Sequence, residues 1–476
     1  MENKDMERKS CINELVTTIQ TSKSLDIVQN ISKTMVGNTF HHHFHLLYDL
    51  RTRLGDSKKI YTEIGTFHGG SACLMLQHPF DTEIHCIDPC AVTLNQYEIL
   101  QQNITKFNNH KRQVKIHRNY STDKQFIEKL HKEGFRTDIL FIDGDNTATG
   151  TRNDFDLFHC FVNPGGYIVF DDYMDNVYTP AVHSTVDDIV KHIEKYSLPY
   201  TVIGSIENYK NAYTCVPMCT SNEFILKKKE STDIPFAICM ATYDRANGKS
   251  KQYLEKCLGA LVNQNYQNFK VFIVGDKYEN EAEFLELVKI IPAEKLYFEN
   301  LKVAVERENI QDKYSRWKVG GVTAMNRAVQ VATEQNFKYI LHADDDDFWD
   351  LTRLSVLNET IKRFPDAIFL YHYSTHPVRV KLPKENLQPE QIYYNNLIPR
   401  ASNAVHATFC INYSMIESFF MKTFDPQNPT AVHYLKCGDE QKIDKVVSMI
   451  QQYPSMYVLF IPMLLCFKDE EAEANK

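Results

Sequence analysis

The stretch Tyr339-Ile-Leu-His-Ala-Asp-Asp-Asp-Asp-Phe-Trp349 begins with apolar residues and then changes into four consecutive aspartates. Its first half has the composition of a buried strand, which the aspartates follow directly. Adjacent carboxylates repel one another, so a folded chain rarely keeps four of them together without a cation. Ligands bind outside the carboxyl ends of strands in α/β sheets. The cluster therefore predicts either a divalent metal that holds a diphosphate or a solvated acidic turn.

The composition is that of a globular protein with a sizeable core. The chain has 476 residues, 43% of them hydrophobic and 24% charged, and a length that allows about three domains. The net charge of −8 disfavours binding of nucleic acid through a basic surface. Twelve cysteines without a C-x-x-C pair predict free thiols in a reducing cytoplasm.

No segment predicts secretion or a membrane span. The N-terminus is charged and lacks the apolar core of a signal peptide. The longest apolar run, residues 456–467, is too short to cross a bilayer and contains Pro462. We expect this run to form a buried strand pair or core segment, in a soluble and cytoplasmic protein.

The first half of the chain contains a strand, a glycine turn and the start of a helix in direct succession. Residues 60–64 predict the strand, and Gly65-Thr-Phe-His-Gly-Gly-Ser71 forms the turn. Glycine lets the backbone pass close to a ligand, and a helix N-terminus offers free N–H groups. A tight turn without a ligand would show the same pattern. A second predicted strand, 83–87, ends in Asp88, which could accept hydrogen bonds from ribose hydroxyls.

Two further predicted strands in this half end in pairs of carboxylates. Residues 138–142 lead into Asp143-Gly-Asp145, and a turn at 163–166 precedes a strand that ends in Asp171-Asp172. Each acid alone is also typical of a helix N-cap or a loop. Because both pairs follow consecutive strands, we expect them to hold a divalent metal together.

Residues 35–228 resemble a class I S-adenosylmethionine-dependent methyltransferase. The match lies in the branch with macrocin-type O-methyltransferases and cephalosporin hydroxylase-like proteins. The resemblance implies that five residues bind the cofactor: Glu63, Gly65, Gly69, Ser71 and Asp88.

The same resemblance implies a divalent metal on Asp143, Asp171 and Asp172, beside the hydroxyl that is methylated. Asp143 or Asp171 would then take the proton of that hydroxyl. The branch commonly has histidine after Asp-Gly-Asp, where this chain has Asn146. If that histidine is the base or a neighbour of the metal, methyl transfer here is altered or lost.

A charged and polar segment, residues 226–235, separates the two halves. We place the boundary at about residue 230. The predicted domains are 1–230, with an N-terminal helical extension, and 231–476.

The second half repeats the alternation of strand and helix. The stretch 236–245 is predicted as a strand that ends in polar residues, 269–276 as a second strand that ends in an acid, and 251–263 has helical spacing. A glycine-marked segment, 317–328, leads into another helix before the aspartate stretch.

Residues 235–470 resemble a family 2 glycosyltransferase of GT-A fold. The resemblance implies that the nucleotide-sugar is bound by Thr242, Tyr243, Arg245, Asp276, Asn326 and Asp345. It places Mg²⁺ or Mn²⁺ on Asp344, Asp346 and Asp347, where the ion would neutralise the leaving diphosphate. Uridine diphosphate is the commonest carrier in that family.

An inverting transfer also needs a base opposite the leaving group. The family supplies it from an acid near a helix start, and the segment 436–444 fits that description. Asp439 is the first choice and Glu440 the second. Both are also ordinary favourable acids in a first helical turn.

We therefore predict an α/β protein with a Rossmann-like methyltransferase domain followed by a GT-A domain. The predicted function is a bifunctional glycan-modifying enzyme that transfers a sugar from a nucleotide-sugar and O-methylates a sugar hydroxyl. Two alternatives stay open. One is a glycosyltransferase with an inactive methyltransferase-like scaffold, and the other is a non-enzymatic glycan-binding assembly protein. The expected partners are a glycan acceptor and the nucleotide-sugar, not nucleic acid, and a homo-oligomer is compatible with the sequence.

Overall fold

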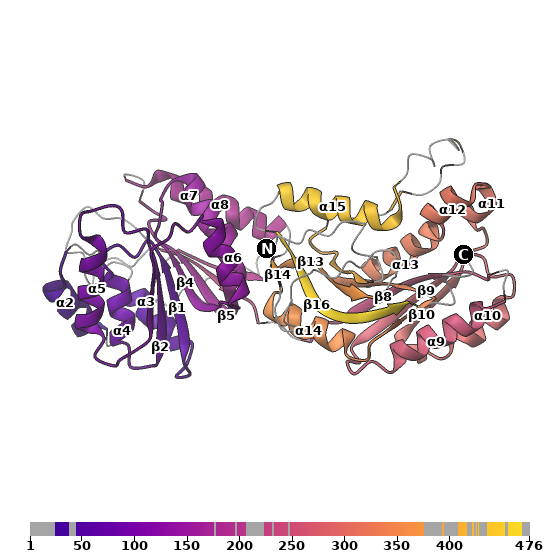
Figure 1. Cartoon of the computed structure of the whole chain (residues 1–476), viewed down its shortest axis with the longest axis horizontal. Coiled ribbons are helices and arrows are strands. Elements are labelled where there is room, and N and C mark those ends of the chain that lie inside the picture. Colours follow the sequence, from indigo (N-terminus) through magenta and orange to yellow (C-terminus); the bar gives the residue numbers. More distant parts are fainter. Residues whose placement is uncertain are drawn as a thin grey trace. The chain divides into compact units, whose positions relative to one another are not determined.

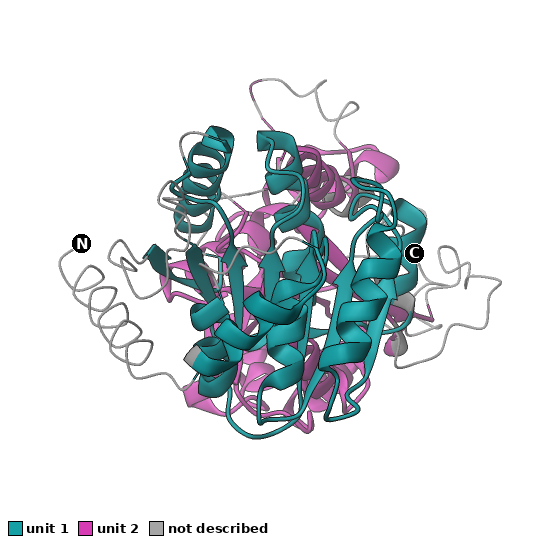
Figure 2. Cartoon of the chain, turned by 90° about the vertical axis from the view of Figure 1, so that its left-hand side faces the viewer, with its two compact units in different colours: residues 1–230 teal, residues 231–476 magenta. Residues whose placement is uncertain are grey.

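Two sheets, one in each half of the chain, organise the structure, which is a computed structural model (Figure 1). The chain divides into two units, Met1–Glu230 and Ser231–Lys476 (Figure 2). The structure describes residues 24–37, 44–175, 178–195, 198–205, 223–230, 233–245, 248–375, 393–394, 408–416, 421–422, 425, 427, 436–452 and 456–468.

The sheet of the first unit has the strand order β3-β2-β1-β4-β5-β7-β6. Its strands are β1 (Lys59–Ile64), β2 (Thr82–Ile87), β3 (Val114–His117), β4 (Thr137–Ile142), β5 (Val162–Phe170), β6 (Tyr200–Ser205) and β7 (Phe224–Lys228). The first five are parallel, and β7 runs antiparallel between β5 and β6. The chain leaves β1 toward β2 on one side and returns as β4 on the other. The loops that follow β1 and β4 therefore meet at a switch point, where ligands bind in such sheets.

Helices cover the buried strands of this sheet. They are α2 (Leu25–Thr34), α3 (Phe44–Arg53), α4 (Gly70–Gln77), α5 (Gln96–Phe107), α6 (Lys124–Lys132), α7 (Ala148–Phe158), the 3-10 turn η1 (His159–Phe161) and α8 (Pro180–Lys195). Every residue of β2 and β4 is buried, as expected for parallel strands covered on both faces.

Gly65 brings the turn after β1 against the end of β4. Its φ is 89°, and a Cβ added there would lie 1.8 Å from the carbonyl oxygen of Asp143. A side chain at this position would therefore push the two loops of the switch point apart.

The turn that the sequence predicts at Asn163–Gly166 lies inside β5 as an irregularity. Thr137 pairs with Val162, but Ile139 pairs with Tyr167, so β5 has extra residues opposite β4. Gly165, with φ 82°, takes up the distortion. Beyond Gly165 the pairing of β5 with β4 is regular as far as Phe170. This regular pairing positions Asp171 and Asp172, which follow the strand.

The sheet of the second unit has the order β10-β9-β8-β11-β15-β13-β16-β12, and β14 pairs with β16. Its strands are β8 (Phe236–Thr242), β9 (Phe269–Gly275), β10 (Leu296–Asn300), β11 (Tyr339–Asp344), β12 (Asp347–Trp349), β13 (Ala367–Ser374), β14 (Tyr393–Tyr394), β15 (Cys410–Asn412) and β16 (Tyr457–Lys468). Strands β10, β9, β8 and β11 are parallel. Their carboxyl ends therefore lie at one edge of the sheet.

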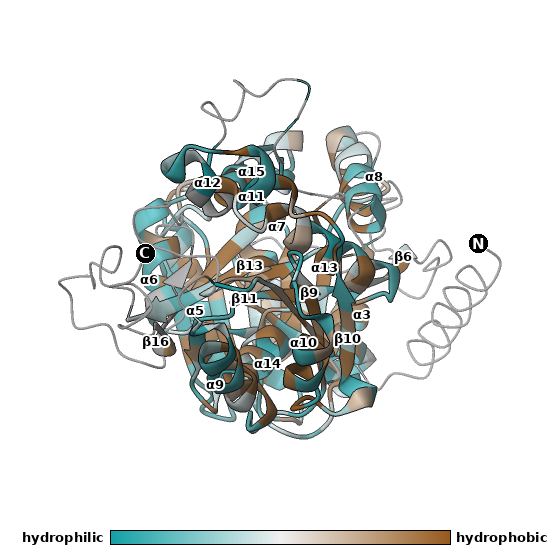
Figure 3. Ribbon diagram, turned by 90° about the vertical axis from the view of Figure 1, so that its right-hand side faces the viewer, coloured by the Kyte–Doolittle hydropathy of each residue, from teal (hydrophilic) through white to brown (hydrophobic). Residues whose placement is uncertain are grey.

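The helices of this unit pack on an apolar sheet. They are α9 (Ser250–Val262), α10 (Glu281–Val288), the 3-10 turn η2 (Ala293–Lys295), α11 (Val305–Asn309), α12 (Lys313–Val319), α13 (Val322–Glu334), α14 (Arg353–Arg363) and α15 (Gly438–Gln452). Figure 3 shows apolar residues concentrated on the strands, while helices such as α9 carry hydrophilic residues. Small side chains of α13, Ala324 and Ala328 among them, let this helix pack closely on the sheet.

The apolar run 456–467, predicted as a strand pair or core segment, forms the single long strand β16. It pairs in parallel with β13 from Tyr457 to Cys466, with shifts in register along the way. Its end pairs antiparallel with β12, where Phe348 lies opposite Phe467 and their rings stack with centroids 5.5 Å apart. Strand β16 thereby attaches the turn that carries the aspartates to the sheet.

Among the described residues, no helix is both long and apolar enough to cross a membrane.

Gly65→Ala should destabilise the first unit more than Gly134→Ala. Both glycines have φ in the left-handed region, 89° and 64°, where an L residue costs about 1–2 kcal/mol. A Cβ at Gly65 would also collide with the backbone of Asp143, whereas nothing lies within 4 Å of a Cβ at Gly134. We expect a loss of about 3 kcal/mol in the free energy of unfolding for Gly65→Ala and about 1 kcal/mol for the control. Urea unfolding measures both, and equal losses would show that the β1 turn moves aside freely.

Candidate active sites at the carboxyl ends of the two sheets

Three aspartates converge where β11 ends in the second unit. Asp344, Asp346 and Asp347 each offer a carboxylate oxygen, and these oxygens lie within 4.8 Å of one another. Asp346 and Asp347 are 4% and 3% exposed. Oxygen ligands at this spacing fit one divalent cation, which would also remove the repulsion among the three charges.

Asp345 faces a different environment from its three neighbours. Its carboxylate accepts hydrogen bonds from both terminal nitrogens of Arg245 and, at 2.6 Å, from Thr242 Oγ1. The paired carboxylate raises the pKa of Arg245 further above its usual range, although burial alone would lower it. These three residues were predicted to bind the nucleotide-sugar. The structure joins them in a bridge that fixes the aspartate turn to the end of β8.

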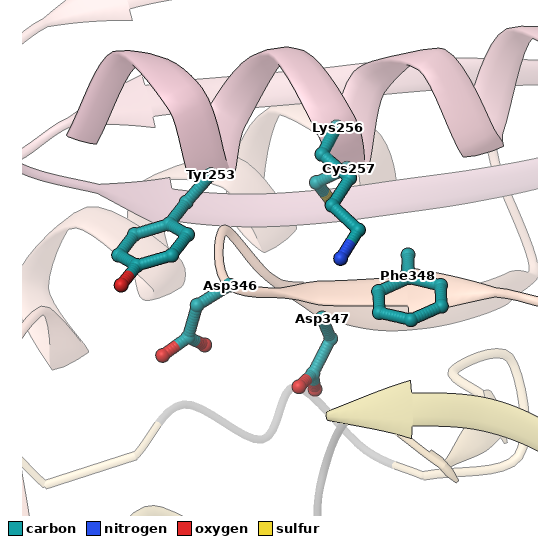
Figure 4. A pocket seen from close by; sticks show the side chains of 6 residues that line it. All are labelled: Tyr253, Lys256, Cys257, Asp346, Asp347 and Phe348. Atoms are coloured by element: carbon teal, nitrogen blue, oxygen red, sulfur yellow. The ribbon is translucent and has the colours of Figure 1, made fainter. Parts of the chain in front are cut away.

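A small pocket lies between α9 and the aspartate turn (Figure 4). It is lined by Tyr253, Lys256, Cys257, Asp346, Asp347 and Phe348. The ammonium of Lys256 lies 4.2 Å from the centre of the Phe348 ring and points toward the turn. A positive group thus accompanies two of the three acids.

Asp276, at the end of β9, presents a buried acceptor atom. Arg307 Nε donates to its Oδ2 at 2.9 Å, while its Oδ1 is buried without a hydrogen-bond partner among the described residues. Burial raises the pKa of Asp276, against the opposing effect of Arg307.

Two guanidinium groups flank the ring of the predicted donor residue Tyr243. The central carbons of Arg245 and Arg307 lie 4.9 and 5.3 Å from the ring centre. Arg307 was not predicted as a site residue, because it belongs to the five-residue helix α11, which no motif marks.

The structure gives Asn326 a contact within the protein. Its amide donates to the carbonyl oxygen of Met421 at 2.7 Å and accepts from the N–H of the same residue at 3.0 Å. Both ends of the side chain thus hold the segment at Met421 against α13. A contact with the nucleotide-sugar stays a prediction.

The predicted base lies at the start of α15. The side chain of Asp439 is outside the described part of the structure, whereas Glu440 accepts a hydrogen bond from the N–H of Cys437 at 3.1 Å. Two residues after Glu440, Lys442 Nζ lies 2.9 Å from His342 Nδ1, and both side chains are buried. Because His342 belongs to β11, the helix with the predicted base is attached to the strand that carries Asp344.

The first unit contains a second trio of aspartates. Asp143 follows β4, Asp171 and Asp172 follow β5, and their carboxylate oxygens lie within 4.8 Å of one another. Burial and the charges of Asp171 and Asp172 raise the pKa of Asp143 well above its usual range. Asn146 Nδ2 donates to Asp172 Oδ2 at 3.0 Å. The residue that stands where the resembled branch has histidine therefore contacts the trio directly.

Glu63 and Ser71, both predicted to bind the cofactor, contact each other. Ser71 Oγ donates to Glu63 Oε1, which ties the end of β1 to the first turn of α4. Gly69 precedes this helix with φ 83° and, as a glycine, has no side chain to cap the N-terminus. The first N–H groups of a helix lack partners within the helix and can bind a ligand.

Asp88 is held by three donors at the end of β2. It accepts from the N–H groups of Phe67 and Cys90, at 2.8 and 2.6 Å, and from Gln96 Nε2 at 3.0 Å. An ionised carboxylate offers about four acceptor sites. Asp88 can therefore accept one further hydrogen bond, which fits its predicted contact with a ribose hydroxyl.

Glu63→Gln should change the pH dependence of stability. Burial raises the pKa of Glu63 to about 8, although hydrogen bonds lower it. From about pH 4.5 to pH 8 the folded state then holds a proton that the unfolded state has lost, so stability falls as the pH rises. Glutamine keeps the acceptor for Ser71 and has no proton to lose. We expect the melting temperature of Glu63→Gln, relative to that of the wild type, to rise as the pH increases from about 5 to about 8 in EDTA. The exposed Glu98→Gln is the control, and parallel pH curves for all three proteins would contradict the prediction.

Asp345→Asn and Asp346→Asn should differ in stability. Asp345→Asn removes the carboxylate that binds the guanidinium of Arg245, whose side chain is 11% exposed, at a cost of about 3 kcal/mol. Asp346→Asn loses a weaker contact with Arg245, at 3.6 Å, and relieves repulsion within the trio. Urea unfolding in EDTA should therefore show a large loss for the first variant and little change for the second. A larger loss for Asp346→Asn would contradict the division of roles.

Comparison with known proteins gives two family matches. Residues 62–173 match the model of a methyltransferase domain, and residues 237–420 match glycosyl transferase family 2. A protein of Acanthamoeba polyphaga mimivirus named as an uncharacterized glycosyltransferase is 34% identical over 251 residues, 52% of this chain and 98% of that protein. An uncharacterized protein of the same virus is 42% identical over 204 residues, 41% of this chain and 91% of that protein.

Among solved structures, an O-methyltransferase from Bacillus cereus in complex with SAH is 15% identical, with a TM-score of 0.30. The match covers 46% of this chain and 90% of that one. The matched parts, 52% and 41% of this chain, cover 98% and 91% of the two viral relatives. The chain therefore belongs to glycosyltransferase family 2 through its second unit, and its first unit is a methyltransferase-like domain.

Proposed function

We propose that this chain is a bifunctional transferase that modifies a glycan. The second unit would transfer a sugar from a nucleotide-sugar, and the first would transfer a methyl group from S-adenosylmethionine to a sugar hydroxyl. One observation carries the proposal, namely that each unit gathers three aspartates at the carboxyl ends of its parallel strands. The presence of both domains in one chain motivates a shared glycan substrate.

In the second unit, Asp344, Asp346 and Asp347 would hold Mg²⁺ or Mn²⁺. The ion would neutralise the charge that develops on the leaving diphosphate. Asp276 can accept an N–H group from the edge of a base through its unpartnered Oδ1, which Arg307 keeps in position. The imide N–H of uracil matches this single acceptor, which supports a UDP-sugar as the donor.

The acceptor hydroxyl needs a base on the side opposite the leaving group, if the transfer inverts the sugar. We assign this role to Asp439 before Glu440, because the carboxylate of Glu440 already accepts a hydrogen bond from Cys437 at the start of α15. The contact between Lys442 and His342 supports the assignment, since it fixes α15 to the strand of the metal-binding acids.

In the first unit, the cofactor would lie across the glycine turn between Gly65 and Gly69, with its ribose at Asp88. Methyl transfer is an in-line displacement, so holding both reactants in position supplies much of the rate. Asp143 or Asp171 would take the proton from the acceptor hydroxyl, beside a divalent metal held by the trio.

Asn146 favours a second candidate function. An amide does not act as a base at neutral pH, and this one is bonded to Asp172. In this alternative the first unit is a scaffold without methyl transfer, and the second unit alone is active.

The test supplies the intact chain with Mn²⁺, methyl-labelled cofactor, a panel of UDP-sugars and glycan acceptors. We expect sugar transfer to fall by about 100-fold or more in Asp346→Asn, and methyl incorporation to fall as much in Asp171→Asn. Each variant should keep the other activity. Asp350→Asn and Asp145→Asn, acids next to the trios but outside them, serve as controls.

The outcomes separate the candidate functions. Sugar transfer without methyl incorporation on any acceptor would support the scaffold alternative. Loss of neither activity in the two trio variants would contradict the proposed sites. Glycan binding without either activity would instead point to an assembly protein.

A further inference from the structure

Arg353, the first residue of α14, is a buried cation without a hydrogen-bond partner. Its side chain is fully buried, and all three guanidinium nitrogens lack a partner among the described residues. The guanidinium carbon lies 3.6 Å from the centre of the Trp349 ring. A cation–π contact with a buried ring stabilises such a charge in part. A buried guanidinium usually also has a carboxylate partner, so its surroundings need an explanation.

Strand β12 connects Arg353 to the metal-binding acids. Trp349 and Asp347 are two residues apart on this strand, so their side chains project to the same face. Phe348 projects to the other face, where it stacks on Phe467. Arg353 therefore lies on the face of β12 that also carries the buried carboxylate of Asp347.

Asp347 favours the charged form of Arg353. Burial lowers the pKa of Arg353 to about 10, while Cys466 and Cys410, and then Asp347, raise it. The guanidinium thus stays protonated at neutral pH. No hydrogen bond joins the guanidinium of Arg353 to the carboxylate of Asp347, so Arg353 does not compete with a metal ion for the oxygens of Asp347 through hydrogen bonding. Charges interact strongly in a buried environment, so the attraction acts without direct contact.

We propose that Arg353 is a positioning residue that acts through Asp347 as a permanent counter-charge of the trio. It keeps Asp344, Asp346 and Asp347 assembled before a divalent ion arrives, and it limits how tightly they then hold the ion. This inference rests on the proposed metal site of the second unit. Weaker retention allows the ion to be exchanged along with the diphosphate.

The sign of one measurement separates this role from a merely structural one. Removal of a packing residue would loosen the site and weaken ion binding. Removal of a counter-charge would strengthen ion binding, because one of the positive charges that oppose a cation at the trio is then gone.

The experiment is calorimetric titration of the full chain with Mn²⁺, in an Asp171→Asn background that disables the first trio. Arg353→Met keeps the apolar stem and removes the charge, and it should bind Mn²⁺ about tenfold more tightly. Arg353→Lys keeps the charge and should stay close to the unmutated affinity. Arg363→Met removes an arginine from the exposed end of the same helix and should have no effect.

Unchanged or weaker Mn²⁺ binding by Arg353→Met would overturn the inference. If thermal unfolding shows that this variant does not fold, Arg353→Gln replaces it with the same expectation. Loss of folding in both would make Arg353 a structural residue and overturn the inference as well. The proposed metal site fails separately, if the background protein binds no Mn²⁺ or if Asp346→Asn leaves the binding intact.

Discussion

Repulsion among carboxylates at the end of a parallel sheet is the constraint on which both halves of this chain depend. Parallel strands bring their carboxyl ends to one edge, so acids that follow neighbouring strands are forced together. In the first unit this edge gathers Asp143 with the pair that follows β5, and in the second it gathers three of four consecutive aspartates. Without a cation such clusters are unstable. The surrounding contacts show how each unit tolerates its cluster.

The two units use different contacts for this purpose. In the second, Arg245 removes one aspartate from the cluster by binding Asp345, and Arg353 places a buried positive charge against Trp349, two residues after Asp347 on β12. In the first, Asn146 donates a hydrogen bond to Asp172, while burial and mutual repulsion raise the pKa of Asp143. The contacts of the second cluster are thus positively charged, whereas the first cluster contacts a neutral amide.

The fold was largely predictable because its signals are local. Apolar runs that end in glycine or acid identified β1, β4 and β11, and the α/β class with two different domains is confirmed. The register of β5 was not predictable, since the bulge at Gly165 depends on its pairing with β4. The same holds for β16, whose role as one long strand depends on partners far away in the sequence.

The candidate sites were predictable in outline and not in detail. The aspartates that form the trios stand in recognisable motifs, and the sequence already separated Asp345 from its neighbours as a predicted contact of the nucleotide-sugar, but it did not predict the bridge that Asp345 forms. Its separate role comes from Arg245, one hundred residues earlier. Arg307 and Arg353 carry no motif at all, because their importance arises from a carboxylate and an indole ring that only the folded chain places beside them.

The pairing of β12 with β16 has a consequence for how the second unit assembles. Asp347 lies opposite Lys468, so the contact closes a loop of about 120 residues, which carries a high entropic cost. During synthesis the aspartate turn leaves the ribosome long before its partner strand exists. Until β16 has been synthesised, the acids lie in a sheet that lacks this strand. This edge is therefore expected to be among the last parts of the unit to become ordered.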